Sequence, residues 1–367
     1  MPRPLLSAAL IVRNEERFLE SCLRSLLGRV DEIVVVDTGS NDRSPEIAQS
    51  LGARLVRRAW SDDFAAARNV SVEAARGEWI LYIDADEEVV HFDRAALELD
   101  LADPRVACYT VRLRPREGYT RYREHRLFRN RPDLRFQGVI HESLLPALSA
   151  LREREGLGEG ASAVTLEHYG YADPKAKAER DLPLLRKRLR SEPGHVYSWA
   201  HLGSTLAAQG DLAGAEAAWR RGAAVVRERR SRTAGDSLPH LHLARHLLDQ
   251  QRDATALLEE ARRWFPDNHA LTWLAARRLF GLRRFEEAMP LFAQLAATDA
   301  ALLDEGELAY DASIFGANAH AALGLCAFHL RRYAESAAHY ARAEAIAPND
   351  AGFRAKRMFA AAKALSG

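Results

Sequence analysis

The first half of the chain alternates short apolar runs with amphipathic segments, and this alternation limits the possible folds more than any other feature. The apolar runs are Leu5–Val12, Glu32–Val36, Arg54–Val56 and Trp79–Ile83. Such runs, rich in Val and Ile, predict strands buried on both faces, and the segments between them predict helices. Strands that alternate with helices indicate a parallel sheet with helices on both of its faces.

The segments between the runs also predict where the helices begin. Glu15–Leu27 has the apolar spacing of an amphipathic helix. Ser44 precedes Pro45, so we expect Ser44 to be an N-cap and Pro45 to lie in the first turn, where a missing N–H costs nothing. Asp62 or Asp63 is expected to cap the next helix, because a carboxylate accepts hydrogen bonds from the first free N–H groups.

Acidic residues directly follow two of the predicted strands. Asp37 ends one strand, and Asp84 ends another and is followed by Asp86, Glu87 and Glu88. Ligands of such sheets bind beyond the carboxyl ends of the strands, so we expect Asp37 and Asp84 to lie near a ligand. Carboxylates at alternate positions can converge on a hard divalent cation. A solvated acidic turn explains the same residues, and the Asp84–Asp86 pair alone favours that simpler interpretation.

Beyond residue 105 the helical rhythm fades, and strands are expected over Ala107–Arg114, Arg126–Arg129 and Ala163–His168. The stretch from Gly156 to Gly160 follows no clear strand and opens no helix, so we expect a flexible surface loop. The arginine-rich segment Arg121–Arg135 is expected to be mostly a solvated hairpin, with binding of donor phosphates or of an acidic acceptor as the alternative. No glycine-rich turn follows the first strand, which argues against a dinucleotide dehydrogenase or a P-loop enzyme.

The second half carries an internal repeat. Trp199–Trp219 and the stretch from residue 320 to 350 share Leu and Gly at matching positions, Leu202-Gly203 and Leu323-Gly324, and two weaker copies lie between them. The layout resembles the tetratricopeptide pattern of paired helices, with Ala351–Leu365 as a capping helix. A plain helical bundle is the alternative. The insertion "RERRSR" (residues 227–232) is expected to be solvated.

Bulk composition narrows the possible partners. Lys plus Arg (52) nearly cancels Asp plus Glu (51), and a net charge of +1 argues against a nucleic-acid partner. Cys22, Cys108 and Cys326 are too few and too far apart for a disulfide framework or a zinc site, so we expect a reducing cytoplasm. No apolar segment reaches membrane-spanning length, and the N-terminal apolar run is too short for a signal peptide.

Six stretches of the first half resemble family 2 glycosyltransferases of the GT-A fold, in the order that the family has them. They are Leu10–Glu16, Ile33–Ser44, Asp62–Asn69, Trp79–Glu87, Leu134–Glu142 and His168–Tyr171. The resemblance implies an α/β GT-A domain, which is a Rossmann-like mixed sheet with helices on both faces, followed by the all-α tetratricopeptide-repeat solenoid. We therefore expect a nucleotide-sugar-binding catalytic domain over residues 1–172, a linker helix over 173–195 and the repeat domain over 196–367.

The resemblance also implies roles for single residues. Those expected to bind the nucleotide are Arg13, Glu15, Asp37, Arg68 and Asp84, and those expected to hold the metal are Asp86 and His168. Three of these roles have a simpler alternative. Asp37 would merely start a turn, Arg68 would be an exposed arginine on an alanine-rich helix, and His168 would be a stray surface histidine.

The acceptor side of the site rests on the stretch Leu134–Glu142. Glu142 matches the family's catalytic base, which takes a proton from the acceptor as it attacks the anomeric carbon. Gly138 and His141 belong to the expected donor-sugar loop, and His141 is a rival base or ligand. The family more often has two acids at this place, so the His-Glu pair is a variant.

The resemblance predicts an inverting hexosyltransferase that depends on Mn²⁺ or Mg²⁺ and moves a sugar from a UDP-sugar to an acceptor. The subset with appended repeats resembles bacterial enzymes that glycosylate peptides, including bacteriocin S-glycosyltransferases, and lipopolysaccharide-core transferases. We expect a protein or peptide acceptor presented by the repeats, which could also form a homodimer. Alternatives are a lipopolysaccharide-core or other glycan acceptor, and a non-catalytic scaffold with a degenerate transferase domain. A sugar-nucleotide pyrophosphorylase is disfavoured because its glycine-rich N-terminal loop is absent.

Overall fold

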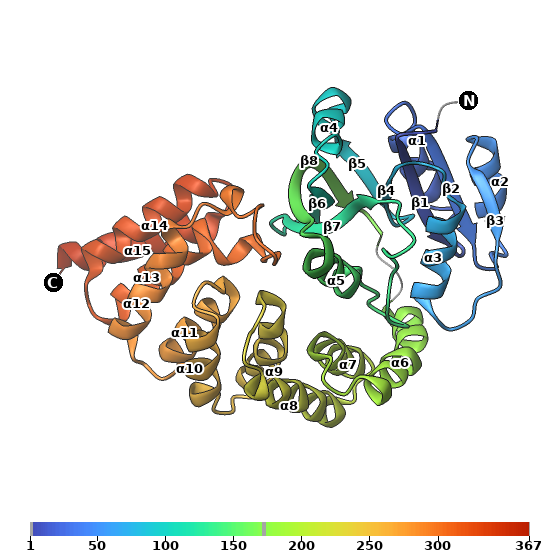
Figure 1. Ribbon diagram of the computed structural model, residues 1–367. Coiled ribbons are helices and arrows are strands. Elements are labelled where there is room, and N and C mark those ends of the chain that lie inside the picture. The colour runs from blue at the N-terminus through green and yellow to red at the C-terminus, as the bar shows by residue number, and fades with distance from the viewer. Residues whose placement is uncertain (1–2, 171–173, 367) are drawn as a thin grey trace. The chain divides into compact units, whose positions relative to one another are not determined.

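The structure is a computed structural model that describes residues 3–170 and 174–366, and these divide into two compact units (Figure 1). The first unit is formed by residues up to 117, by 121–193 and by 305–307. The second is formed by 118–120, by 194–304 and by 308 onward. Tyr171 of the last family stretch and the predicted boundary at residues 172 and 173 lie outside the described residues. The extent of the predicted domains therefore stays a prediction.

The first unit is built on a single mixed sheet. Its strands are β1 (Leu6–Val12), β2 (Glu32–Asp37), β3 (Arg54–Arg57), β4 (Trp79–Tyr82), β5 (Glu87–His91), β6 (Val106–Arg114), β7 (Tyr122–Arg129) and β8 (Gly158–His168). They lie in the order β3-β2-β1-β4-β7-β6-β8-β5. The first four strands pair in parallel, as the alternating sequence predicts. β7 is antiparallel to β4 and β6, and β5 is antiparallel to β8, so the sheet as a whole is mixed.

Helices cover both faces of this sheet because successive strand residues point to opposite faces. The helices of this layer are α1 (Leu19–Leu26), α2 (Ser44–Ser50), α3 (Phe64–Ala74), α4 (Arg94–Leu101) and α5 (Leu145–Glu155). On β1, Leu10 belongs to the apolar cluster that includes α1, α2 and α4. Its neighbour Ala9 belongs to the opposite cluster, with α3 and α5. The predicted α/β class with helices on both faces is confirmed.

Local chemistry fixes two of the helix starts. Asp63, one of the two caps considered, accepts the backbone N–H of Ala66 at 2.9 Å and begins α3. The prediction for α2 is wrong, since its N-cap is Arg43 rather than Ser44. The Ser44 hydroxyl instead accepts the backbone N–H of Glu15 at 2.8 Å. Ser44 therefore anchors the segment that follows β1.

The glycine-rich stretch is not the flexible loop that was expected. Gly156 ends α5 in the left-handed region, with a φ of +69°, and the next two glycines belong to β8. A Cβ at Gly160 would overlap the ring of Tyr109 on β6. Gly160 thus allows two neighbouring strands to approach, which the spacing of the glycines alone did not reveal.

The arginine-rich segment also differs from the expected solvated hairpin. Much of it is β7, which lies inside the sheet between β4 and β6. Arg126 on this strand is 4% exposed. Its buried charge needs partners, and these lie beside the cavity of the first unit.

The second unit is all-helical, and the predicted tetratricopeptide-like array is confirmed. Its helices are α7 (Val196–Ala208), α8 (Leu212–Glu228), α9 (Leu238–Asp249), α10 (Thr255–Trp264), α11 (His269–Gly281), α12 (Phe285–Ala297), α13 (Gly316–His329), α14 (Tyr333–Ile346) and α15 (Ala351–Ser366), with 3-10 turns η1 (Ala234–Ser237), η2 (Ala300–Leu302) and η3 (Ala312–Ile314). Helices adjacent in the sequence pack against one another from α7 to α15, in yellow to red in Figure 1.

The repeat signature has a packing cause. A Cβ at Gly203 on α7 would overlap the indole of Trp219 on α8, whose Nε1 donates to the carbonyl of Ala200 at 3.0 Å. At the matching position on α13, a Cβ at Gly324 would lie 3.0 Å from the ring of Tyr340 on α14. Each glycine therefore lets an aromatic side chain bring the two helices of a repeat together.

The insertion at residues 227–232 is largely exposed, as expected, but some of its arginines have partners. Arg227 donates twice to Glu260 on α10, at 2.6 and 2.7 Å. The guanidinium of Arg232 lies over the ring of Trp264 at 4.2 Å from its centroid. These contacts tie an otherwise exposed segment to α10.

Two general expectations can be compared with the described residues. Cys22, Cys108 and Cys326 are free and buried. Among the described helices, none combines the length and the apolar character that crossing a membrane requires. The helix α6 (Pro174–Ser191) groups with the first unit.

Candidate active site

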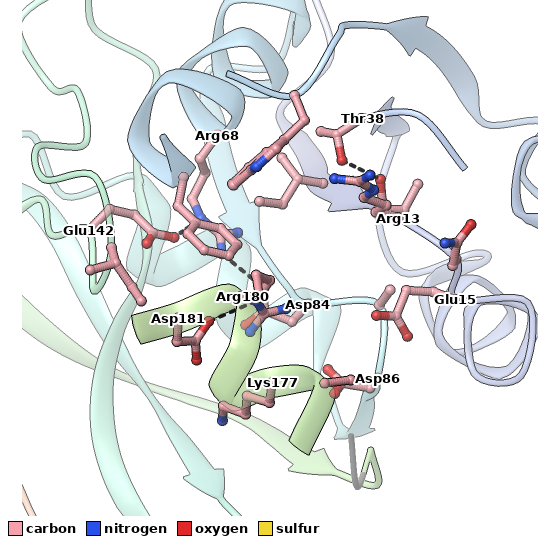
Figure 2. A pocket seen from close by; sticks show the side chains of 18 of the residues that line it. Arg13, Glu15, Thr38, Arg68, Asp84, Asp86, Glu142, Lys177, Arg180 and Asp181 are labelled. Atoms are coloured by element: carbon pink, nitrogen blue, oxygen red, sulfur yellow. Dashed lines mark hydrogen bonds and ion pairs between the residues drawn. The ribbon is translucent and has the colours of Figure 1, made fainter. Parts of the chain in front are cut away.

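A cavity of about 640 Å³ lies beyond the carboxyl ends of β1, β2 and β4, and all of its lining residues belong to the first unit (Figure 2). Segments that are far apart in the sequence meet there: the loops after the strands, α3, the end of β8 and α6. The predicted site residues that line it are Arg13, Glu15, Arg68, Asp84, Asp86, His141, Glu142 and His168. Asp37 and Gly138 are not among the lining residues.

Arg68 on α3 joins two of the predicted acids. Its Nε donates to Glu142 Oε1 at 2.7 Å, and its Nη2 donates to Asp84 Oδ1 at 2.8 Å. Its side chain is 6% exposed, so the alternative of an exposed arginine is excluded. A buried guanidinium that bonds to two carboxylates holds both of them in a fixed orientation. Figure 2 shows Glu142 and Asp84 on opposite sides of Arg68.

A second buried arginine, which the sequence analysis missed, supports the same site. Arg126 on β7 bonds to Asp84 Oδ2 at 3.3 Å and to Glu87 Oε1 at 2.9 Å. The guanidinium groups of Arg126 and Arg68 lie 4.3 and 4.6 Å from the ring centroid of Tyr82, the last residue of β4. No local motif in the sequence marks the contacts of Arg126 with Asp84 and Glu87, because these residues come from distant parts of the chain.

The charges around Asp84 act in opposite directions. Enclosure in the cavity wall opposes its ionisation, but Arg68 and Arg126 outweigh this effect and hold the pKa of Asp84 well below its usual value. Burial raises the pKa of Glu87, although Arg126 counteracts the shift. Asp84 is therefore a fixed negative charge at the end of β4.

Asp86 and His168 meet on another wall of the cavity. His168 Nε2 lies 3.0 Å from Asp86 Oδ2, so His168 is not a stray surface histidine. Burial opposes protonation of this imidazole, but the bond to Asp86 raises its pKa. A Cβ at Gly170 would overlap the Asp86 carboxylate, which explains why glycine stands there.

These two residues fit a divalent cation. Two adjacent ligands of an octahedral ion with bonds of about 2.1 Å lie about 3.0 Å apart, which is the separation of Asp86 Oδ2 and His168 Nε2. The described residues contain no group of three or more acidic, histidine or cysteine side chains arranged around a common point for a metal. A cation held by this pair would keep open positions for other oxygen ligands.

Glu15 adds a second acidic group near Asp86. Partial burial, and then the negative charges of Asp86 and Asp84, raise its pKa to about 7, while Arg180 counteracts the shift. Neighbouring carboxylates with too little positive charge around them repel one another, and a bound cation would relieve this repulsion. Arg13, two residues earlier in the loop after β1, is exposed at the rim.

The loop that carries Glu142 is closed on itself. Gln137 and Ser143 exchange backbone hydrogen bonds at 3.1 and 3.0 Å, and the Phe64 N–H donates to the Val139 carbonyl at 2.9 Å. Within the loop, Gly138 and His141 lie in the left-handed region, with φ values of +104° and +52°. Gly138 packs away from the cavity, against the guanidinium of Arg188 on α6.

Asp37 has a structural partner. Its Oδ1 accepts the backbone N–H of Ser40 at 3.0 Å, which stabilises the turn after β2, and its side chain is buried. The next residue, Thr38, lines the cavity instead. The role of Asp37 in binding a base stays a prediction.

Several lining residues were missed because no local pattern distinguishes them. Trp60 and Phe64 form an edge-to-face pair with ring centroids 4.8 Å apart. Lys177, Arg180 and Asp181 come from α6, which the sequence analysis treated as a linker (Figure 2). Arg180 bonds to Asp181 at 2.7 Å and lies over the ring of Phe64.

Comparison with known families matches residues 7–157 to "Glycosyl transferase family 2". A TPR repeat-containing protein of Synechococcus elongatus is 41% identical over 218 residues, which cover 57% of this chain and 54% of the relative. The glycosyltransferase SunS of Bacillus subtilis is 27% identical over 207 residues, or 52% of this chain and 46% of the relative. The chain thus spans about half the length of these relatives.

Among solved structures, glucosyl-3-phosphoglycerate synthase from Mycobacterium tuberculosis is a distant match. It is 18% identical, has a TM-score of 0.37 and covers 50% of this chain and 78% of its own. The match to the family description includes the segments that place Arg13, Arg68, Asp84, Asp86 and Glu142, but it ends before His168 and α6. The match to the glycosyl transferase family 2 description thus covers residues 7–157 of the 367-residue chain.

Proposed function

We propose that the chain is a metal-dependent, inverting glycosyltransferase that moves a sugar from a UDP-sugar to a protein or peptide acceptor. One observation carries the proposal: Arg68, Asp84 and Glu142 form a bonded row in the same cavity as the Asp86–His168 pair. Most residues that line this cavity lie in the segment that matches family 2, and the cavity lies beyond the strand ends where such sheets bind ligands.

The nucleotide half of the donor binds at the loops after β1 and β2. Glu15 accepts hydrogen bonds from ribose hydroxyls, and Arg13 lies at the rim, where its charge favours the diphosphate. Asp84 faces the ribose, because Arg68 and Arg126 keep it ionised and oriented. Asp37 accepts a hydrogen bond from the N–H of the base, and its Oδ1 already accepts the backbone N–H of Ser40.

Asp86 and His168 hold a Mn²⁺ or Mg²⁺ ion. Such an ion supplies positive charge that neutralises the diphosphate as it leaves. The residues that bind the nucleotide orient the donor so that its diphosphate lies next to this ion. Glu15 is close enough to shift with the charge of Asp86, so it senses the same ion.

Glu142 is the catalytic base. Its Oε1 is occupied by Arg68, which leaves Oε2 to take the proton from the acceptor as the acceptor attacks the anomeric carbon. The bond from the sugar to the diphosphate then breaks, and the new bond forms on the opposite face of the sugar. His141 is the rival base, since it belongs to the same loop.

The acceptor is proposed to be a protein or peptide because stacked helix pairs form an extended surface suited to such chains. Experiment has to identify the transferred sugar and the acceptor atom that attacks it. Native mass spectrometry of the full chain with Mn²⁺ and a panel of nucleotide sugars should detect a complex with a UDP-sugar. If the chain binds only nucleotide sugars without UDP, the proposed UDP-sugar donor is wrong. If the chain neither hydrolyses any of these nucleotide sugars nor transfers their sugar, the proposed transferase activity is wrong.

A further inference from the structure

Helix α6 lies outside the segment that matches family 2, yet one of its side chains reaches the loop that carries Glu142. Arg188 is only 6% exposed in its side chain. Its Nη1 donates to the carbonyl oxygens of Ile140 and His141, the latter at 3.0 Å. These are the two residues that immediately precede Glu142.

The loop is shaped to receive this guanidinium. A Cβ at Gly138 would overlap Nη1 and Cζ of Arg188 and displace the guanidinium, and the φ of +104° separately favours glycine there. His141 has a φ of +52°, an unusual conformation for a residue with a side chain, and it persists only where its surroundings hold it. The bond from Arg188 to the His141 carbonyl is one such restraint.

The pairing of Arg188 is unusual for a buried arginine. Among the described residues, its only carboxylate partner is Glu192, four residues later and just beyond the end of α6, at 3.3 Å. Its remaining bonds to acceptors outside α6 go to the two loop carbonyls. A buried guanidinium with several donors suits the fixing of carbonyls in a chosen orientation.

We propose that Arg188 is a positioning residue, which holds the loop from Gln137 to Ser143 so that Glu142 faces the acceptor. This inference rests on the proposed function, because it assigns Glu142 as the base. Arg188 does not line the cavity and touches no substrate. It acts through the backbone of Ile140 and His141, while Arg68 orients the carboxylate itself.

The test uses the full chain with Arg188→Met, Arg188→Lys and, as a matched control, Arg186→Met. Arg186 is an exposed arginine on the same helix. Hydrogen exchange of residues 137–143 should increase in Arg188→Met and stay as in the wild type in Arg186→Met. The value of kcat should fall about 10²-fold in Arg188→Met, the usual effect of a small misplacement of a reacting group. UDP affinity in the presence of Mn²⁺ should be unchanged, because the nucleotide contacts lie on other loops.

Further measurements separate positioning from general stability. Arg188→Lys should recover part of kcat, because an ammonium can bond to one carbonyl but not reproduce the planar fork. In a Glu142→Gln background, Arg188→Met should lower kcat little further, since both changes then act on the same step. Unchanged exchange and kcat in Arg188→Met would overturn the inference. So would a loss of UDP affinity and melting temperature in parallel with kcat. A wild-type chain without transferase activity would refute the proposed function, while the exchange data would still decide the role of Arg188.

Discussion

The two sides of the cavity balance their charges differently. On the side that we call the arginine side, Asp84 and Glu142 bond to Arg68, and Arg126 adds a second guanidinium to Asp84. On the histidine side, Asp86 bonds to His168, and the pKa of the nearby Glu15 is raised to about 7. The protein therefore fixes the geometry of the arginine side by itself. On the histidine side it leaves a charge deficit, which means too little positive charge for the carboxylates, and a bound cation would supply that charge.

Removing Asp86 should have the largest effect, because it takes away the group that the histidine side offers to a cation. Loss of a residue that only supports a metal ligand costs about 10–100-fold in affinity or activity, so loss of the ligand itself in Asp86→Ala should cost more and abolish turnover. Titration calorimetry should show that Mn²⁺ no longer strengthens UDP binding. Glu88→Ala is the matched control, since Glu88 is close in sequence but does not line the cavity. Binding of UDP that still requires Mn²⁺ in Asp86→Ala would contradict the assignment.

The arginine side is tested by Glu142→Gln, which keeps the size of the side chain and its bond to Arg68 but cannot accept a proton. The single-turnover rate should fall by ~10²–10⁴-fold, the usual contribution of a general base, while UDP affinity is retained. The loss is expected to be smaller for a thiol acceptor, which is already partly ionised near neutral pH. Glu153→Gln on α5 is the control. An unchanged rate with a hydroxyl acceptor would move the role of base to His141.

Arg126→Met should separate stability from chemistry on the arginine side. Breaking a buried ion pair leaves a charge without its partner and costs about 3–5 kcal/mol, and here it would free both Glu87 and Asp84. Urea unfolding should show the loss, with Arg57→Met on the exposed edge strand β3 as control. Stability equal to that of the wild type would mean that Tyr82 and Arg68 alone hold Asp84.

The two sides also differ in how far the sequence predicted them. The rule that ligands bind at strand ends predicted Asp84 near the cavity, and the family resemblance added Asp86 and Glu15. Arg126 sits in a run of arginines that charge patterning marks as solvated, and its burial follows only from the position of β7 between β4 and β6. Pairing between distant strands leaves no local mark on the sequence.

Helices show the same limit. The parallel half of the sheet and the helical repeats were predicted because their periodicities are local, and Gly203 against Trp219 explains one repeat signature in packing terms. No sequence pattern indicated that α6 would supply Lys177, Arg180 and Asp181 to the cavity or Arg188 to the loop beside it. A linker and a structural helix have similar composition, and only tertiary contacts distinguish them.

The smallest expected effect concerns the pH dependence of stability on the histidine side. The pKa of Glu15 in the folded chain is about 7, above the ordinary value of 4.5, so the folded state holds a proton that the unfolded state releases as the pH rises between these values. The stabilisation is fully present below 4.5 and is lost as the pH rises through about 7. Glu15 is partly exposed, and solvent screening limits the change in the free energy of unfolding to about 1 kcal/mol or less.

Without metal, the melting temperature of the wild type should therefore fall from about pH 5 to about pH 8. The fall should be smaller in Glu15→Gln and unchanged in the control Glu20→Gln on α1. Mn²⁺ should stabilise the wild type more at the higher pH, where Glu15 is ionised. If Mn²⁺ stabilises the chain equally at both pH values, the charge deficit is not what distinguishes this side from the arginine side.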